Sequence, residues 1–221
     1  MDKIKTHDLF LEVPDFLKEF FNSCIFPWEM LSSIKEFILN TIKSGLKGFK
    51  NYSENVIVGK DVKIYPNVYI EGPCILGACT EVRPGAFIRG SVIAGDNCVL
   101  GNSSEFKNCI LLNGVQAPHY NYVGDSILGS HVHLGAGTIC SNLKGDKKAV
   151  VIHGEENYDT NIRKVGAILG DYVDIGSGSV LNPGTIIGRN TRVYPLNCLR
   201  GVYKENFIIK SPLNIVKNKD Y

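Results

Sequence analysis

The sequence predicts an all-β solenoid of short strands that follows a helical segment. Large apolar residues recur at every sixth position from Val58 onward. Small or β-branched residues follow them four places later, and glycine, proline, asparagine or aspartate often lies between the two. A fixed short period of this kind is typical of proteins built from stacked repeats. An ordinary antiparallel strand pattern alternates with period two and would not keep this phase over ten hexads.

Each hexad is expected to supply one short strand and one turn, with one large side chain pointing inward. Glycines and asparagines at the turns accept the backbone angles of a tight corner. Three hexads close one triangular coil, and the coils stack at about 4.8 Å, the spacing of hydrogen-bonded strands. The expected inward residues are Val58, Ile64, Ile70, Leu76, Val82, Ile88, Ala94, Leu100, Phe106 and Leu112, and then Leu128, Leu134, Leu169, Ile175, Leu181, Ile187, Val193 and Leu199.

The first 53 residues follow a different pattern and are predicted to be helical. Apolar residues lie three and four apart in residues 15–21 and 27–42, which is the helical period. Pro27 suits the first turn of the second helix, and Gly45 suits its end. Because this segment carries no chemical motif, we expect it to cap the solenoid or to contact a partner. The predicted units are a helical segment over 1–53, a solenoid domain over 54–208 with an inserted loop over 143–166, and a C-terminal tail over 209–221.

Composition argues against several classes of protein. A net charge of +2 over 221 residues creates no strong field toward nucleic acid. The apolar runs are too short to span a membrane, and Met1-Asp2-Lys3-Ile4 does not open a signal peptide. The seven cysteines are odd in number and lack a Cys-x-x-Cys pair. They indicate reduced thiols packed in the core of a cytoplasmic protein.

The hexad phase breaks at two places, which are therefore the places to look for function. Only five residues separate Val123 from Leu128, so one corner is altered just after His119. The charged insertion over 143–166 then interrupts the coil. Its residues cannot fill an interior position, so it is expected to project as a loop. In stacked-repeat proteins, insertions gather on the face that binds ligands.

The consensus over about residues 56–203 resembles that of the hexapeptide-repeat acyltransferases. The resemblance implies a left-handed parallel β-helix, an exception to the usual right-handed crossover, and a homotrimer with active sites between subunits. The segments "GNSSEFKN", "APHYNYVGDSILGSHVHLGAGTICSNL" and "LGDYVDIGSGSVLNPGTIIG" are similar to the acetyltransferase domain of bifunctional N-acetylglucosamine-1-phosphate uridyltransferase. That domain acetylates glucosamine 1-phosphate with acetyl-CoA as co-substrate. Residues 1–53 are too few for the nucleotide-binding domain of that enzyme.

Acetyl transfer to an amine needs a base and donors for the thioester oxyanion. The resemblance implies that His119 is the base, since imidazole titrates near neutral pH, and that Glu105 orients it or contacts the sugar. It assigns the oxyanion to the backbone N–H of Ala136, helped by the hydroxyl of Ser177, because fixed donors suit developing negative charge. The alternative interpretations are an exposed corner residue for His119, a solvated coil face for Glu105 and an ordinary turn residue for Ser177.

The resemblance also implies the residues that bind the two substrates. Charge-assisted donors suit a phosphate, and arginine offers two of them in one plane. The residues implied to bind the acceptor substrate are Arg83, Lys107 and Lys148 for its phosphate, Tyr122 and Asn142 for its sugar, and His133 near the sugar, where the family has an asparagine. Lys147 could serve in place of Lys148. Acyl-CoA would lie along the groove near Gly176, Tyr194 and Pro195.

These assignments lead to two hypotheses for function. The first is an acyl-CoA-dependent N-acyltransferase, in which the amine attacks the thioester directly because no cysteine has an adjacent base. The second is a non-catalytic module that binds a sugar phosphate or nucleotide sugar and partners a separate nucleotidyltransferase. A purely structural trimer would leave the match around His119 unexplained. No metal is expected, because His119, His131 and His133 lack the carboxylate or thiolate spacing of a zinc site.

Overall fold

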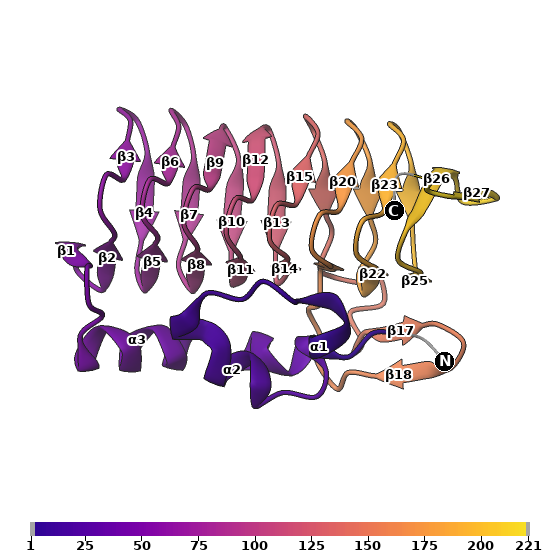
Figure 1. The fold of residues 1–221 in the computed structure, drawn as a ribbon, viewed down its shortest axis with the longest axis horizontal. Helices are drawn as coiled ribbons and strands as arrows, with labels where there is room; N and C mark the ends of the chain where they lie inside the picture. Colours follow the sequence, from indigo (N-terminus) through magenta and orange to yellow (C-terminus); the bar gives the residue numbers. More distant parts are fainter. Residues whose placement is uncertain (1–2, 220–221) are drawn as a thin grey trace.

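Three parallel β-sheets enclose one interior, and a layer of short helices lies along one side of them (Figure 1). This computed structural model describes residues 3–219. Strands of successive coils pair in parallel, whereas the end pairs, β1 with β2 and β26 with β27, are antiparallel. The coils form a left-handed β-helix, so the fold that the hexapeptide pattern implied is confirmed.

The three sheets are named A, B and C in the order in which each coil visits them. Sheet A contains β1 (Lys50–Ser53), β2 (Val56–Val58), β5 (Cys74–Leu76), β8 (Val92–Ala94), β11 (Cys109–Leu111), β14 (Ile127–Leu128), β19 (Ala167–Leu169), β22 (Thr185–Ile187) and β25 (Val202–Tyr203). Sheet B contains β3 (Lys63–Ile64), β6 (Glu81–Val82), β9 (Val99–Asn102), β12 (Gln116–His119), β15 (His133–Leu134), β20 (Asp174–Ile175), β23 (Arg192–Val193), β26 (Phe207–Ser211) and β27 (Asn214–Lys217). Sheet C contains β4 (Tyr69–Glu71), β7 (Phe87–Arg89), β10 (Glu105–Lys107), β13 (Tyr122–Gly124), β16 (Ile139–Cys140), β21 (Val180–Leu181) and β24 (Cys198–Leu199).

Buried side chains fill the interior in the predicted hexad order, with one correction. The inward residue recurs every six positions from Val58 to Phe106, but the next one is Leu111 and not Leu112. The hexad after Phe106 is one residue short. Leu112 therefore faces outward and packs in the apolar cluster that the helices share with sheet A.

The corner that joins sheet C to sheet A is irregular in three successive coils. It is one residue short before Leu111 and again before Leu128, and in the next coil it carries the insertion over 143–166. The corner that carries His119 joins sheet B to sheet C instead. Its hexad is complete, since Ala117 lies six positions after Leu111 and faces inward. The altered corner therefore shapes the surface beyond β13 and leaves the turn at His119 regular.

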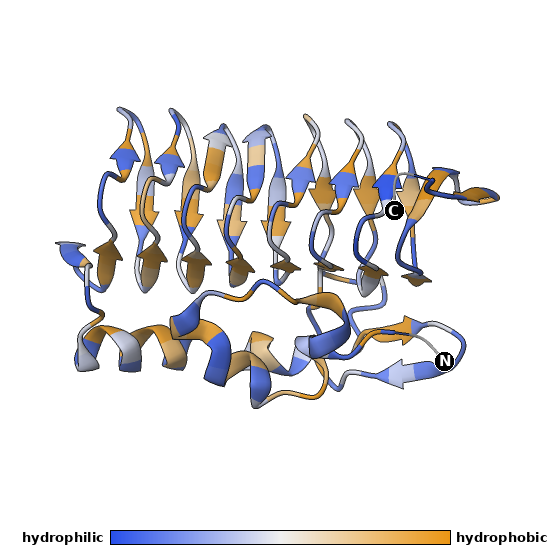
Figure 2. Cartoon of the chain, viewed as in Figure 1, coloured by the Kyte–Doolittle hydropathy of each residue, from blue (hydrophilic) through white to orange (hydrophobic). Residues whose placement is uncertain are grey.

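The N-terminal segment is helical as predicted, but it covers a side of the solenoid and not its end (Figure 1). Its helices are α1 (Thr6–Leu9), η1 (Asp15–Leu17), α2 (Lys18–Asn22), η2 (Pro27–Ser32) and α3 (Ile34–Ser44), where η marks a 3₁₀ helix. Their apolar faces turn toward the apolar outer face of sheet A, as the colouring in Figure 2 shows. The helices and that face share one buried cluster.

A column of isoleucines explains why the helices cover this side. The outward position at the centre of sheet A is Ile57, Ile75, Ile93, Ile110, Ile127, Ile168 and Ile186 in seven successive coils. Each side chain is at most 5% exposed. A β-branched side chain suits a strand, and a column of them leaves an apolar stripe that needs a cover. Leu17, Met30 and Ile38 of the helices belong to the same cluster.

The insertion joins this layer and does not project as the expected loop. Its centre forms the hairpin β17 (Val151–His153) and β18 (Asn157–Asp159), which lies beside the helices in Figure 1. Ile152 is fully buried in the helical cluster. The Tyr158 ring lies with its centre 5.8 Å from that of Phe26 and 6.2 Å from that of Trp28. The insertion therefore packs against the helical segment, and its first part follows directly after Asn142.

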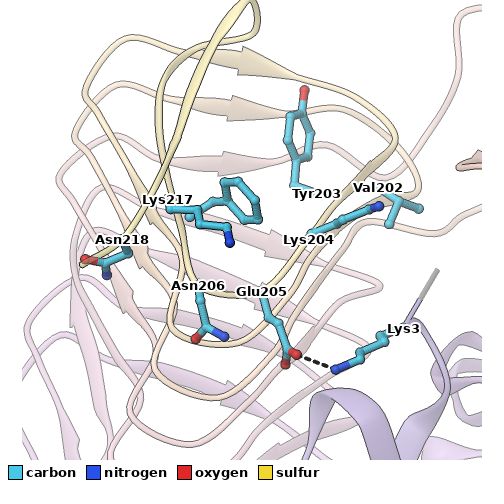
Figure 3. A pocket seen from close by; sticks show the side chains of 9 residues that line it. Lys3, Val202, Tyr203, Lys204, Glu205, Asn206, Lys217 and Asn218 are labelled. Carbon is cyan, nitrogen blue, oxygen red and sulfur yellow. Dashed lines mark hydrogen bonds and ion pairs between the residues drawn. The ribbon is translucent and has the colours of Figure 1, made fainter. Parts of the chain in front are cut away.

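The C-terminal tail pairs with the last coil and forms a pocket there. The hairpin of β26 and β27 crosses the boundary predicted at residue 208. A pocket of about 430 Å³ lies beside it, lined by Tyr203, Phe207, Lys217 and others (Figure 3). The Lys3 ammonium reaches the Glu205 carboxylate at 2.6 Å across this pocket, which ties the N-terminal end to the last coil.

All seven cysteines are free thiols, and four of them point into the coils. Burial raises the pKa of Cys98 and of Cys140 to about 12, so both stay protonated at neutral pH. A buried thiol of this kind behaves as a small apolar side chain. Within residues 3–219, no helix combines the length and the apolar character that a membrane span needs.

Candidate active site

His119 ends β12 at the corner between sheets B and C. The His119 N–H donates to Oδ1 of buried Asn121 at 3.1 Å, and Asn121 Nδ2 donates to the Gly135 carbonyl of the next coil at 2.9 Å. These bonds fix the backbone of the corner. The His119 side chain is exposed, and among the described residues it has no hydrogen-bond or ion-pair partner. Its imidazole is therefore free to contact a ligand.

Ala136, Ser177 and Pro195 follow His119 at the same corner in successive coils. The Gly137 N–H donates to the His119 carbonyl at 3.0 Å, the Gly178 N–H to the Ala136 carbonyl at 2.8 Å, and the Leu196 N–H to the Ser177 carbonyl at 2.9 Å. The structure thus brings the predicted base, the predicted oxyanion donors and Pro195 into one row, and the other predicted acyl-CoA residues, Gly176 and Tyr194, come directly before Ser177 and Pro195.

The two predicted oxyanion donors are exposed along this row. The Ala136 N–H makes no hydrogen bond within the part of the chain that the structure describes, and Ala136 is exposed. The Ser177 hydroxyl is also exposed and without a partner among those residues. Gly135 makes room for it, because a Cβ there would lie 2.8 Å from Ser177 Oγ. Both donors are therefore available to hydrogen-bond a bound oxygen atom.

A second group of predicted site residues, called the sheet C group, lies on the outer face of sheet C. It consists of Glu105, Lys107, Tyr122 and Asn142. Glu105 pairs in register with Tyr122 across neighbouring coils, and Lys107 with Gly124. Asn142 Nδ2 donates to Tyr122 Oη at 3.1 Å. Gly124 leaves room for both side chains, because a Cβ there would lie 2.5 Å from Tyr122 Oη and 2.7 Å from Asn142 Nδ2. The predicted sugar ligands and Lys107 thus lie together.

Tyr122 keeps its proton at neutral pH, since partial burial is the largest cause that raises the pKa of its phenol. Its oxygen accepts from Asn142, so its O–H is free to donate to a ligand. This arrangement suits a hydroxyl-bearing acceptor such as a sugar.

Two residues of this group were missed by the sequence reasoning. Asp125 is 4% exposed and accepts hydrogen bonds from Lys107 Nζ at 3.4 Å and from Asn142 Nδ2. Arg89 lies one coil before Lys107, and its guanidinium contacts the Glu105 carboxylate at 2.6 Å. The hexad register was the signal that could have found Arg89. For Asp125, the signal was the shortened corner in which it lies.

Three of the residues predicted to bind the acceptor substrate lie outside this group in the single chain. Arg83 lies at the B–C corner two coils before His119 and contacts Glu81 at 3.4 Å. Lys148 is exposed in the insertion, where its backbone N–H donates to Asp146. His133 is on the outer face of sheet B, where Nδ1 lies 2.8 Å from Asp174.

The contact between His133 and Asp174 predicts a pH-dependent contribution to stability. The hydrogen bond from the ring to Asp174 raises the pKa of His133. The stabilisation is therefore complete below the unfolded pKa of about 6.5 and is lost as pH rises through the higher folded value. Both side chains are about half exposed, so we expect only about 0.2–1 kcal/mol. Urea unfolding of wild type and Asp174→Asn should differ near pH 6 and coincide near pH 9, and a constant difference would contradict this.

A pocket of about 500 Å³ lies where the insertion meets the coils. It is lined by Ser141, Leu143, Lys144, Asn182 and Arg200, among others. Arg200 donates to His153 Nε2 of the hairpin at 2.7 Å. Within residues 3–219, no cluster of three His, Cys, Asp or Glu side chains is arranged to hold a metal ion. His131 instead lies 3.5 Å from Glu12 and stacks on Tyr172.

The sequence matches the family described as the GMPPB C-terminal domain over residues 70–191, more than half of the chain. The chain belongs to this family. The region that it shares with the family includes His119, Ala136 and Ser177 and the whole sheet C group.

Curated relatives confirm the resemblance that the motifs indicated. The bifunctional protein GlmU of Methanococcus aeolicus is 36% identical over 223 residues, covering 92% of this chain and 50% of that protein. The bifunctional sugar-1-phosphate nucleotidylyltransferase/acetyltransferase of Sulfurisphaera tokodaii is 33% identical over 176 residues, covering 76% of this chain and 43% of that protein. The chain thus spans about half the length of the curated relatives it matches.

Among solved structures, the acetyltransferase domain of PglB from Neisseria gonorrhoeae in complex with acetyl coenzyme A is similar over 82% of this chain and 63% of that chain. The sequence identity is 15% and the TM-score is 0.39.

Proposed function

We propose that this chain is an acyl-CoA-dependent N-acyltransferase that acetylates an amino-sugar phosphate such as glucosamine 1-phosphate. One observation carries the proposal. An unpartnered imidazole, a free backbone N–H and a free hydroxyl lie in successive coils of one corner, at His119, Ala136 and Ser177. The neighbouring sheet C carries a lysine, a tyrosine hydroxyl and an amide suited to a phosphorylated sugar. The relative from Sulfurisphaera tokodaii, whose name includes acetyltransferase, supports this function.

The geometry suits direct transfer without an acyl-enzyme. The nitrogen of the acceptor amine forms a bond to the thioester carbon, and His119 Nε2 or Nδ1 takes a proton from that amine. The carbonyl oxygen becomes an oxyanion that accepts hydrogen bonds from the Ala136 N–H and the Ser177 hydroxyl. The carbon–sulfur bond then breaks, and the departing thiolate takes the proton from the imidazolium. Cys140 is buried with a pKa of about 12, so it is no nucleophile.

The same surface supports a homotrimer with sites between subunits. Sheet A is covered by the helices, so a second copy can reach the coils only through the other two sides. Apolar side chains are exposed there: Tyr69 is 60% exposed on sheet C, and Tyr120 and Leu196 are 65% and 84% exposed at the B–C corner. Closing these surfaces against a neighbour would exclude water from His119.

The second candidate is a non-catalytic module that binds a sugar phosphate or nucleotide sugar beside a separate nucleotidyltransferase. It is favoured by one observation. One curated relative is named as both a nucleotidylyltransferase and an acetyltransferase. In this candidate, the sheet C group would bind the ligand and His119 would have no proton to take.

Thiol release from acetyl-CoA distinguishes the two candidates. With glucosamine 1-phosphate present, the acyltransferase releases CoA in proportion to enzyme, and glucosamine without the phosphate serves as the matched control. Thermal stabilisation by both acetyl-CoA and the sugar phosphate is also expected. Stabilisation by the sugar phosphate alone, with no thiol release, would reject the acyltransferase and favour the binding module.

A further inference from the structure

We infer that Asp125 is a positioning residue. It orients the side chains that bind the acceptor substrate and joins them to the N-terminal helical layer. This inference rests on the proposed function. Asp125 lies in the shortened corner between β13 and β14 and is almost completely buried. A buried carboxylate is stable only when its oxygens are hydrogen-bonded. Its donors are Lys107, Asn108 and Asn142, which come from the coils on both sides of its own.

The carboxylate decides how Asn142 presents itself to a ligand. A carboxylate only accepts hydrogen bonds, so the amide nitrogen of Asn142 has to face Asp125. That nitrogen donates to both Asp125 Oδ2 and Tyr122 Oη. Both amide hydrogens are therefore used, and Asn142 Oδ1 is left to accept from a hydroxyl or amine of the acceptor. Tyr122 keeps its O–H to donate. The buried Asp125 carboxylate thus leaves one hydrogen-bond acceptor, Asn142 Oδ1, and one donor, the Tyr122 O–H, available to the sugar.

Asp125 also holds Lys107 without saturating it. Nζ lies 3.4 Å from Asp125 Oδ2, a loose contact, and the Lys107 side chain is 26% exposed. An ammonium has three hydrogens, so it can keep this contact and still donate two to a phosphate. The carboxylate therefore keeps the lysine pointed at the cluster before the ligand binds, which lowers the entropy lost on binding.

A single asparagine connects this cluster to the helices. Asn108 Nδ2 donates to Asp125 Oδ1 at 2.9 Å and to the Leu31 carbonyl at 3.0 Å. Leu31 belongs to η2 and is 3% exposed, packed in the helical layer. Asn108 has a φ of 47°, a left-handed conformation that asparagine adopts more readily than most residues. The helical layer thus holds the back of the acceptor site through one hydrogen-bonded chain, Leu31 to Asn108 to Asp125.

Steady-state kinetics with two pairs of variants test this role. Asp125→Asn keeps the size of the side chain but replaces one acceptor oxygen with a donor. Its matched control is Asp61→Asn, at another left-handed corner where the carboxylate is exposed. Asn108→Gly keeps the positive φ and removes the amide, and its control is Asn97→Gly, exposed with a φ of 57°.

We expect Asp125→Asn to raise KM for glucosamine 1-phosphate by about 10- to 100-fold and to leave KM for acetyl-CoA unchanged. Asn108→Gly should raise the same acceptor KM by about 3- to 10-fold, and both controls should match wild type. Equal changes in both KM values, or none, would overturn the positioning role. If Asp125→Asn does not fold, Asn108→Gly decides the question alone. If wild type itself releases no thiol, the proposed function fails, and calorimetric Kd values for glucosamine 1-phosphate then test the same variants.

Discussion

His119→Asn is expected to lower kcat for acetyl transfer by about 10²- to 10⁴-fold, the usual effect of losing a general base. Asparagine keeps a polar side chain of similar reach but cannot take a proton. The corner should survive, since its hydrogen bonds use the His119 backbone and the Asn121 side chain. KM for both substrates should therefore stay near wild type. The measurement is thiol release from acetyl-CoA with glucosamine 1-phosphate.

A matched control for this variant is available at another corner. His131 is also exposed and stacks on Tyr172 at the corner between sheets A and B, so His131→Asn should leave kcat unchanged. Turnover of His119→Asn at the wild-type rate would remove the imidazole from the mechanism.

Ile110→Ala is expected to lower the free energy of unfolding by about 2–5 kcal/mol. Ile110 is fully buried near the middle of the isoleucine column, between Ile93 and Ile127. Truncation leaves a cavity between a paired strand and the helical layer, where backbone hydrogen bonds limit collapse. Urea unfolding followed by circular dichroism measures the change.

Ile25→Ala provides the control for this second prediction. Ile25 belongs to the same helical segment but is 63% exposed, so its truncation should change the free energy of unfolding by less than about 0.5 kcal/mol. Equal effects of the two substitutions would show that the column is not what holds the helices to sheet A.

The inward hexads could be read from the sequence because each one depends on local spacing alone. The prediction was wrong at Leu112, where a shortened corner moved the inward position to Leu111. A leucine stands at both positions, so hydropathy could not detect the shift. The isoleucine column was equally visible in the letters, one residue before each inward position of sheet A, but its meaning depends on what covers it.

The candidate site was predicted in part. The row of His119, Ala136 and Ser177 follows from the hexad register, since equivalent positions in successive coils must stack. Asp125 was missed, although it lies within the string that drew attention to His119. Its role depends on the short corner, which brings Lys107, Asn108 and Asn142 to one carboxylate.

The left hand of the coil was expected from the family resemblance, whereas the repeat by itself determined the coil, its interior and the corner at which His119, Ala136 and Ser177 stack. These features depend on a period of six and on which residues accept tight turns. The tertiary structure alone decided that the helices cover sheet A, that the insertion packs beside them, and that Leu31 reaches Asp125 through Asn108. Those contacts join residues far apart in the chain. No local spacing encodes them, because they arise only when two apolar surfaces exclude water between them.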